Sequence, residues 1–95
     1  MGFADRSLER RFVVAREGTR AWGAGVARAY IRRLNAIALA RNWDELHSLP
    51  GLRLHPLHGR RSGQWAISLT GRWRVVVEPD GDGMMVIEVT NHYGD

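Results

Sequence analysis

The first forty residues carry apolar side chains at helical spacing, and this pattern predicts two helices. Asp5 is suited to cap the first helix, in which Leu8, Phe12 and Ala15 recur on one face, and Gly18 is expected to end it. A second, longer helix is predicted from about residue 24 to residue 40, with arginines opposite an apolar stripe formed by Val26, Tyr30, Leu34, Ile37 and Ala38. The two helices are expected to pair as a hairpin.

A break in the helical pattern separates these helices from the rest of the chain. A short helical turn is predicted at 43–49, opened by Asn42 or Asp44. Pro50-Gly51 ends this turn and leads into a short extended piece at 52–54.

From residue 65 onward, apolar and polar residues alternate, which predicts three antiparallel strands. Tight turns are expected at Thr70-Gly71 and at 80–83. The alternating positions are Trp65, Ile67 and Leu69, then Trp73, Val75 and Val77, then Met85, Ile87 and Val89. Trp65 and Trp73 are expected to be core aromatics. This order of elements predicts a single α+β domain over residues 1–95, in which two N-terminal helices pack on one face of a small antiparallel sheet. The opposite face of the sheet is then expected to carry the functional residues.

The composition narrows the available chemistry. The chain has no cysteine, which excludes disulfides, thiolate metal sites and a cysteine nucleophile. No apolar run has the length of a signal peptide or of a membrane-spanning helix. We therefore expect a cytoplasmic protein without a membrane partner.

The charge distribution indicates a phosphate-bearing partner. The formal net charge is +4, and all 14 basic residues are arginines, whose planar guanidinium suits phosphate and stacks on bases. The stretch 46–77 contains no acidic residue but carries Arg53, Arg60, Arg61, Arg72 and Arg74. This is the pattern of an RNA-binding surface. A general arginine bias of the source, or a basic face that meets solvent or an acidic protein, would give the same pattern.

One segment carries a distinctive motif. Residues 52–67 read Leu-Arg-Leu-His-Pro-Leu-His-Gly-Arg-Arg-Ser-Gly-Gln-Trp-Ala-Ile, and the next strand carries Arg72-Trp73-Arg74. This pattern resembles the signature of the HigB-type killer toxins of the RelE superfamily, and the resemblance covers nearly the whole chain. It implies a RelE-like fold, cleavage of mRNA at the ribosome, and inhibition by a helix-turn-helix, HigA-like antitoxin.

The same resemblance implies roles for individual residues. It points to His55 as a histidine in or beside the reaction and to Arg74 as the arginine that holds the scissile phosphate. His58 stands where the family has a lysine, and an imidazole readily exchanges a proton near neutral pH. The chain reads Asn91-His92-Tyr93 where many relatives end in Asp-Tyr-His, so the acidic residue is missing and the order of tyrosine and histidine is reversed.

These residue types suit RNA cleavage by the substrate's own 2′-hydroxyl. Attack of that hydroxyl on the adjacent phosphate needs a base, an acid for the departing 5′-oxygen, and a cation for the charge on phosphorus. It needs no metal ion or other cofactor. We predict that the catalytic residues are His55, His58, Arg74, His92 and Tyr93. We predict that the RNA-binding residues are Arg53, Arg60, Arg61, Arg72 and Asn91.

The strand register decides whether these residues meet. The side chains of Arg72 and Arg74 leave one face of their strand, while those of Glu88, Thr90 and His92 leave a single face of the next strand. One register places Arg74 and His92 together on the open side of the sheet. The opposite register separates them, and the sequence permits both.

Each assignment has a plainer alternative. His55 could hydrogen-bond a strand end, and His58 could be a solvated loop residue. The spacing His55-x-x-His58 could bind zinc together with His92 or Glu88, but four ligands of the usual kinds are not apparent, so no metal site is predicted. The alternative function is that of a RelE-fold protein without nuclease activity, either a ParE-like gyrase inhibitor or a module that only binds its antitoxin.

Overall fold

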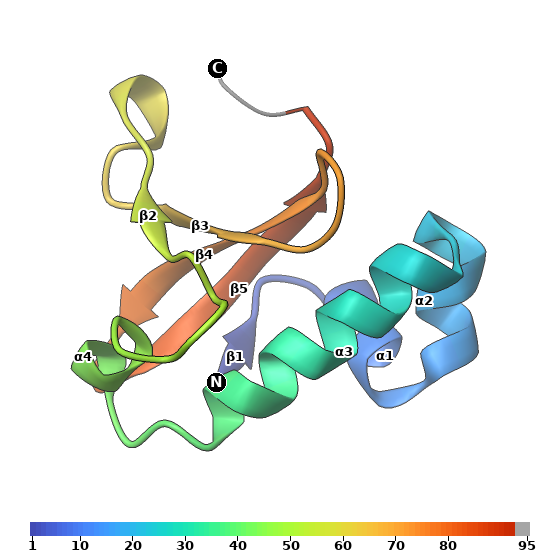
Figure 1. Ribbon diagram of the computed structural model, residues 1–95, viewed down its shortest axis with the longest axis horizontal. Helices are drawn as coiled ribbons and strands as arrows, with labels where there is room; N and C mark the ends of the chain where they lie inside the picture. Colours follow the sequence, from blue (N-terminus) through green and yellow to red (C-terminus); the bar gives the residue numbers. More distant parts are fainter. Residues whose placement is uncertain (93–95) are drawn as a thin grey trace.

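The computed structural model describes residues 1–92 and has helices packed on one face of a five-stranded sheet (Figure 1). In chain order the elements are β1 (Gly2–Phe3), α1 (Arg6–Val13), α2 (Ala15–Trp22), α3 (Ala24–Ala38), α4 (Trp43–Leu46), β2 (His55–Pro56), the 3₁₀ turn η1 (Gly59–Arg61), β3 (Trp65–Ser68), β4 (Arg74–Asp80) and β5 (Gly83–Thr90). The predicted α+β fold with helices on one sheet face is confirmed. No helix among the described residues has the length and apolarity needed to cross a membrane.

The first predicted helix is two helices in the structure. Asp5 caps α1 as predicted, because its carboxylate accepts hydrogen bonds from Ser7 Oγ at 2.7 Å and Leu8 N at 3.0 Å. These hydrogen bonds lower the pKa of Asp5 below its usual value. Helix α1 stops at Val14, whose backbone is extended with φ −114° and ψ 101°. The β-branched pair Val13-Val14 favours such a break, since β-branched side chains are restricted in helices.

The prediction that Gly18 ends the first helix is wrong, because Gly18 lies inside α2. A Cβ atom at this position would lie 3.2 Å from the Cβ of Ala27 and 3.3 Å from the carbonyl oxygen of Arg11. The missing side chain therefore lets α2 pack closely against α3 and α1. In a sequence, a glycine after an apolar stripe is as typical of a helix end as it is of close packing between helices.

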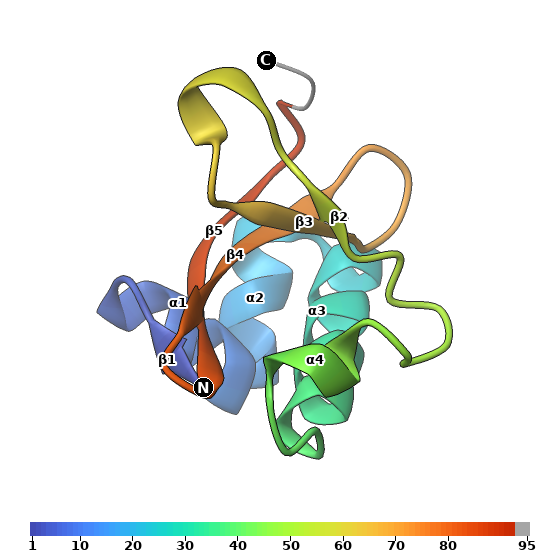
Figure 2. The same ribbon diagram turned by 90° about the vertical axis from the view of Figure 1, so that its left-hand side faces the viewer.

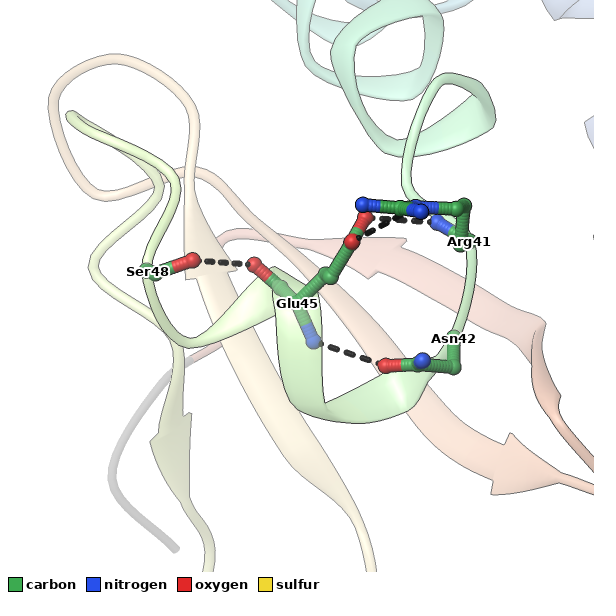
Figure 3. Close-up of polar contacts among 4 residues, drawn as sticks. All are labelled: Arg41, Asn42, Glu45 and Ser48. Atoms are coloured by element: carbon green, nitrogen blue, oxygen red, sulfur yellow. Dashed lines mark hydrogen bonds and ion pairs between the residues drawn. The ribbon is translucent and has the colours of Figure 1, made fainter.

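The turn from α3 into α4 is closed by local hydrogen bonds (Figure 3). Of the two predicted caps, Asn42 is the one used, and its side chain accepts from Glu45 N at 3.0 Å. The Glu45 carboxylate accepts from the backbone N of Arg41 at 2.8 Å and from its Nε at 3.0 Å, which lowers the pKa of Glu45. Ser48 Oγ donates to the carbonyl oxygen of Glu45 at 2.9 Å.

The sheet has the strand order β1-β5-β4-β3-β2. Strands β3, β4 and β5 form the predicted antiparallel meander, and β2 adds to β3 in antiparallel fashion. Strand β1 pairs with β5 in parallel, so the prediction of a purely antiparallel sheet is wrong at this edge. The predicted extended piece at 52–54 precedes the observed strand His55–Pro56. Strands of two residues carry too few alternating positions to be recognised from a sequence.

The core lies between the sheet and α3. Its fully buried side chains are Tyr30 and Leu34 from α3 and Ile67, Val75, Val77 and Val86 from the sheet. Trp65 and Trp73 are partly buried and pack against this core, in agreement with their predicted structural role.

A buried hydrogen bond connects α3 to α1. Tyr30 Oη donates to the carbonyl oxygen of Leu8 at 2.8 Å, and burial raises the pKa of the Tyr30 phenol. Tyr30→Phe removes this bond while keeping the ring, so we expect it to destabilise the fold by about 1 kcal/mol. In a domain of this size that corresponds to a fall in Tm of roughly 4–8 °C. Thermal unfolding of the variant measures this, and an unchanged Tm would contradict the assignment.

Candidate active site

Strand pairing determines which side chains lie on the open face, the face of the sheet that points away from α3. Arg74 on β4 pairs with Ser68 on β3 and with Thr90 on β5, and paired residues project to the same side of a sheet. The next residue, Val75, is fully buried in the core. Arg74 and its partners therefore lie on the open face, in the register that the sequence left as one of two possibilities.

A second row of residues crosses the open face next to that of Arg74. His55 on β2 pairs with Ala66, Ala66 pairs with Val76, and Val76 pairs with Glu88 on β5. Ala66 and Val76 are only 0% and 2% exposed although they lie on this face. They form a small apolar floor between the two polar residues His55 and Glu88.

Four of the predicted site residues line one hollow at the end of this face. A cavity of about 440 Å³ is lined by Arg72, Arg74, Asn91 and His92. Among the described residues, this lining contributes two guanidinium groups, an amide and an imidazole, and no carboxylate. The backbone N of His92 donates to Thr90 Oγ1 at 3.0 Å, which fixes the chain as it leaves β5. This lining is suited to bind a phosphate.

Arg74 is held in place by the turn that precedes it. Its Nη1 donates to the carbonyl oxygens of Gly71 and Trp73, both at 2.9 Å. Gly71 has a positive φ of 56°, a conformation that favours glycine. Arg33 of α3 donates from Nε to the carbonyl oxygen of Ser68 at 3.1 Å and supports the same turn from the helix side. Sequence reasoning missed Arg33, because a helical arginine with an apolar neighbour gives no signal of such a contact.

His55 has a defined tautomer in its neutral form. Its Nδ1 lies 2.9 Å from the carbonyl oxygen of Arg53. A carbonyl oxygen only accepts, so Nδ1 carries the proton and Nε2 is the nitrogen with the lone pair. Arg53 has a φ of 53°, a left-handed conformation that is unusual for a residue other than glycine. This contact orients the half-buried imidazole on β2.

The remaining loop residues lie outside the lining of this cavity. His58 precedes η1 and is exposed, and Arg53 and Arg60 are also exposed. The structure therefore brings Arg72, Arg74, Asn91 and His92 together, and it places His55 on the same face two strands away from β4. His58 borders this face in the segment between β2 and β3.

Arg61 has a different environment from Arg60. Its side chain is 30% exposed and forms an ion pair with Glu88, and its Nη1 donates to Gln64 Oε1 at 2.9 Å. Glu88 is the carboxylate that the alternation of β5 places on the same face as Thr90. Within residues 1–92, no three His, Cys, Asp or Glu side chains are grouped so as to hold a metal ion. Tyr93, the fifth predicted catalytic residue, lies outside the described residues.

The fold is similar to that of a solved structure. The structure is similar to that described as "YoeB/ParE toxin from Agrobacterium tumefaciens", with a TM-score of 0.60 and 20% sequence identity over 97% of this chain and 96% of that chain. The two chains thus share the arrangement of helices on a mixed sheet. No curated protein matches the sequence significantly.

The sequence itself identifies the family. Residues 1–93 match the family described as the RelE-like toxin of type II toxin-antitoxin system HigB. The chain belongs to this family and is a toxin of a type II toxin-antitoxin system. Membership implies an antitoxin as its partner.

Proposed function

We propose that this toxin is a ribosome-dependent endoribonuclease that cleaves mRNA in the cytoplasm by attack of the substrate's 2′-hydroxyl, without a metal ion. The observation that carries the proposal is the cavity on the open face, where Arg72, Arg74, Asn91 and His92 converge. Two arginines there can bind one phosphate group, and the imidazole beside them can transfer a proton.

Arg74 is assigned the central role in this mechanism. Its guanidinium is already oriented by the carbonyl groups of Gly71 and Trp73, so it need not reorganise when charge develops on the phosphate. Arg72 adds a second positive charge, and Asn91 adds an amide that hydrogen-bonds to the backbone or a base of the RNA.

Proton transfer is assigned to the histidines and to Tyr93. His92 lines the cavity beside Arg74, and we assign to it the protonation of the leaving 5′-oxygen. His55 presents Nε2 as a base from β2, which lies about 10 Å from β4 because neighbouring strands are about 4.8 Å apart. An RNA strand that crosses the open face from β4 toward β2 would contact both groups. His58 and Tyr93 are proposed as further donors or acceptors at the rim.

The types of side chain present favour a mechanism without metal. Within residues 1–92, no carboxylate lines the cavity, and Glu88 is paired with Arg61. Asp80 and Asp82 lie at the end of the β4–β5 hairpin opposite to Arg74. Divalent cations such as Mg²⁺ prefer carboxylate and other oxygen ligands, and the part of the chain that the structure describes does not gather such ligands around Arg74.

We further propose that the partner is a HigA-like, helix-turn-helix antitoxin. Induction of the toxin with and without that antitoxin, followed by mapping of mRNA 5′ ends, tests the proposed function. We expect new ends inside coding sequences that disappear when translation of the message is blocked. Growth arrest with intact mRNA and loss of DNA supercoiling would instead indicate a ParE-like gyrase inhibitor.

The exposed arginine at position 60 is expected to contribute affinity and not chemistry. Arg60→Gln should weaken binding to ribosomes and reduce the slope of log K against log salt by about one, since one phosphate contact is lost. The matched control is Arg41→Gln, because Arg41 is exposed but paired with Glu45 in the turn before α4. An unchanged salt slope for Arg60→Gln would remove this residue from the interface.

A further inference from the structure

The segment between β2 and β3, residues 57–64, forms an arm that contains η1 and projects from the sheet. Both views show the arm at the end of the molecule where β5 finishes, on the side away from the helices (Figure 1 and Figure 2). The base of the arm is closed by a hydrogen bond from Leu57 N to the carbonyl oxygen of Gln64 at 2.9 Å. On the sheet side of this hydrogen bond, β2 pairs with β3 at only two positions, His55 with Ala66 and Pro56 with Trp65. The sheet thus gives the arm a narrow attachment.

We propose that the ion pair of Arg61 with Glu88 forms a latch that fixes the arm against β5. The latch positions His55, just before the arm, and His58, within it, relative to Arg74. This inference rests on the proposed function and names two positioning residues for it. It also changes the role of Arg61, which the sequence predicted as an RNA contact.

The geometry of the Arg61 guanidinium supports a positioning role. One nitrogen donates to Gln64 within the arm, and the other donates to Glu88, which is 27 residues further along the chain. The side chains of Arg61 and Glu88 are 30% and 39% exposed, so the pair is shielded more than a fully solvated surface bridge. Gln64 N donates to the carbonyl oxygen of Arg61 at 2.9 Å, which fixes the backbone that carries the guanidinium. The bond to Gln64 orients the guanidinium within the arm, and the bond to Glu88 connects it to β5.

Electrostatics gives the latch a second effect. Glu88 lies on the open face, one row from Arg74, and an unpaired carboxylate there would repel an approaching phosphate. Arg61 neutralises that carboxylate. The charge of Arg61 is therefore used inside the protein, whereas that of Arg60, at the exposed side of the same turn, is available to RNA.

Two measurements on Arg61→Gln, Glu88→Gln and the charge-exchanged pair Arg61→Glu/Glu88→Arg test the latch. The first is hydrogen exchange of the backbone amides of 57–64 in the purified toxin, which does not depend on activity. We expect faster exchange in both single variants and recovery in the exchanged pair. The second is single-turnover cleavage of mRNA on programmed ribosomes. We expect each single variant to lower the rate at saturation about tenfold with little change in half-saturating concentration, since misplaced groups lose rate more than binding.

Glu78→Gln is the matched control, because Glu78 is a carboxylate on β4 outside the arm and should leave both measurements unchanged. If the exchanged pair does not fold, Arg61→Lys serves instead, and its retained charge should preserve most of the protection of 57–64.

Each other outcome has a definite meaning. Unchanged exchange in Arg61→Gln would overturn the latch. If Arg61→Gln lost ribosome affinity and had a reduced salt slope, as expected for Arg60→Gln, Arg61 would be an RNA contact. This result would also overturn the latch. Loss of cleavage in Glu88→Gln but not in Arg61→Gln would show that Glu88 acts on the substrate itself. If the parent toxin cleaves no RNA, the proposed function fails, and the exchange measurement still decides whether the latch exists.

Discussion

Arg74→Ala is expected to reduce mRNA cleavage by about 100-fold or more, the usual effect of removing one preorganised charge-stabilising group. Arg74 lies on the open face in the row of Ser68 and Thr90, lines the cavity with His92, and is oriented by two carbonyl groups. Its loss removes the oriented cation from the place where the phosphate would sit. Cleavage rates on programmed ribosomes and growth after induction both measure this effect.

The control variants for Arg74 separate charge from geometry. Arg74→Lys keeps the charge but cannot form the same fork of hydrogen bonds, so it should recover only part of the rate. Arg72→Ala should have a smaller effect, because Arg72 is exposed and lies before β4 begins. A folded Arg74→Ala protein that cleaves mRNA at the parent rate would remove Arg74 from the site.

An mRNA blocked at the 2′-position is expected to resist cleavage almost completely. A 2′-deoxy or 2′-O-methyl group at the cleaved nucleotide removes the proposed nucleophile, while the phosphate and its contacts with Arg74 are retained. The unmodified substrate should give an upstream fragment that ends in a 2′,3′-cyclic phosphate. The reaction should also tolerate removal of any metal bound to the toxin, provided that the ribosome's own magnesium is restored.

The outcome that contradicts this mechanism is equally specific. Efficient cleavage of the blocked substrate, or an upstream fragment ending in a 3′-hydroxyl, would show that water or a metal-bound hydroxide attacks the phosphate. The matched control carries the same modification one nucleotide away from the cut and should be cleaved normally.

The sequence predicted those parts of the fold that depend on a repeated pattern. The alternating pattern that includes Ile67, Val75 and Val77 predicted the meander, and the apolar stripe through Tyr30 and Leu34 predicted α3. The break at Val14 and the strands β1 and β2 were missed, since each involves one or two residues whose conformation is set by packing.

The candidate site was predicted as a set of residue types but not as an arrangement. Strand alternation placed Arg74 with the polar residues of β5 in only one of two registers, and the choice depends on how the strands pair. The pairing of Arg61 with Glu88 could not be seen in advance, because it joins a loop to a strand 27 residues away. Tyr93 lies outside the described residues, so its role stays a prediction.

Reconstituted cleavage tests the central claim most directly. Purified toxin is added to ribosomes programmed with a defined mRNA, with the Arg74→Ala variant in parallel, and the RNA fragments are separated and their ends identified. The account predicts ribosome-dependent cutting by the parent toxin, a cyclic phosphate on the upstream fragment, and a reaction slower by about 100-fold or more in the variant. Intact mRNA with the parent toxin, together with inhibition of DNA gyrase in a supercoiling assay, would contradict it.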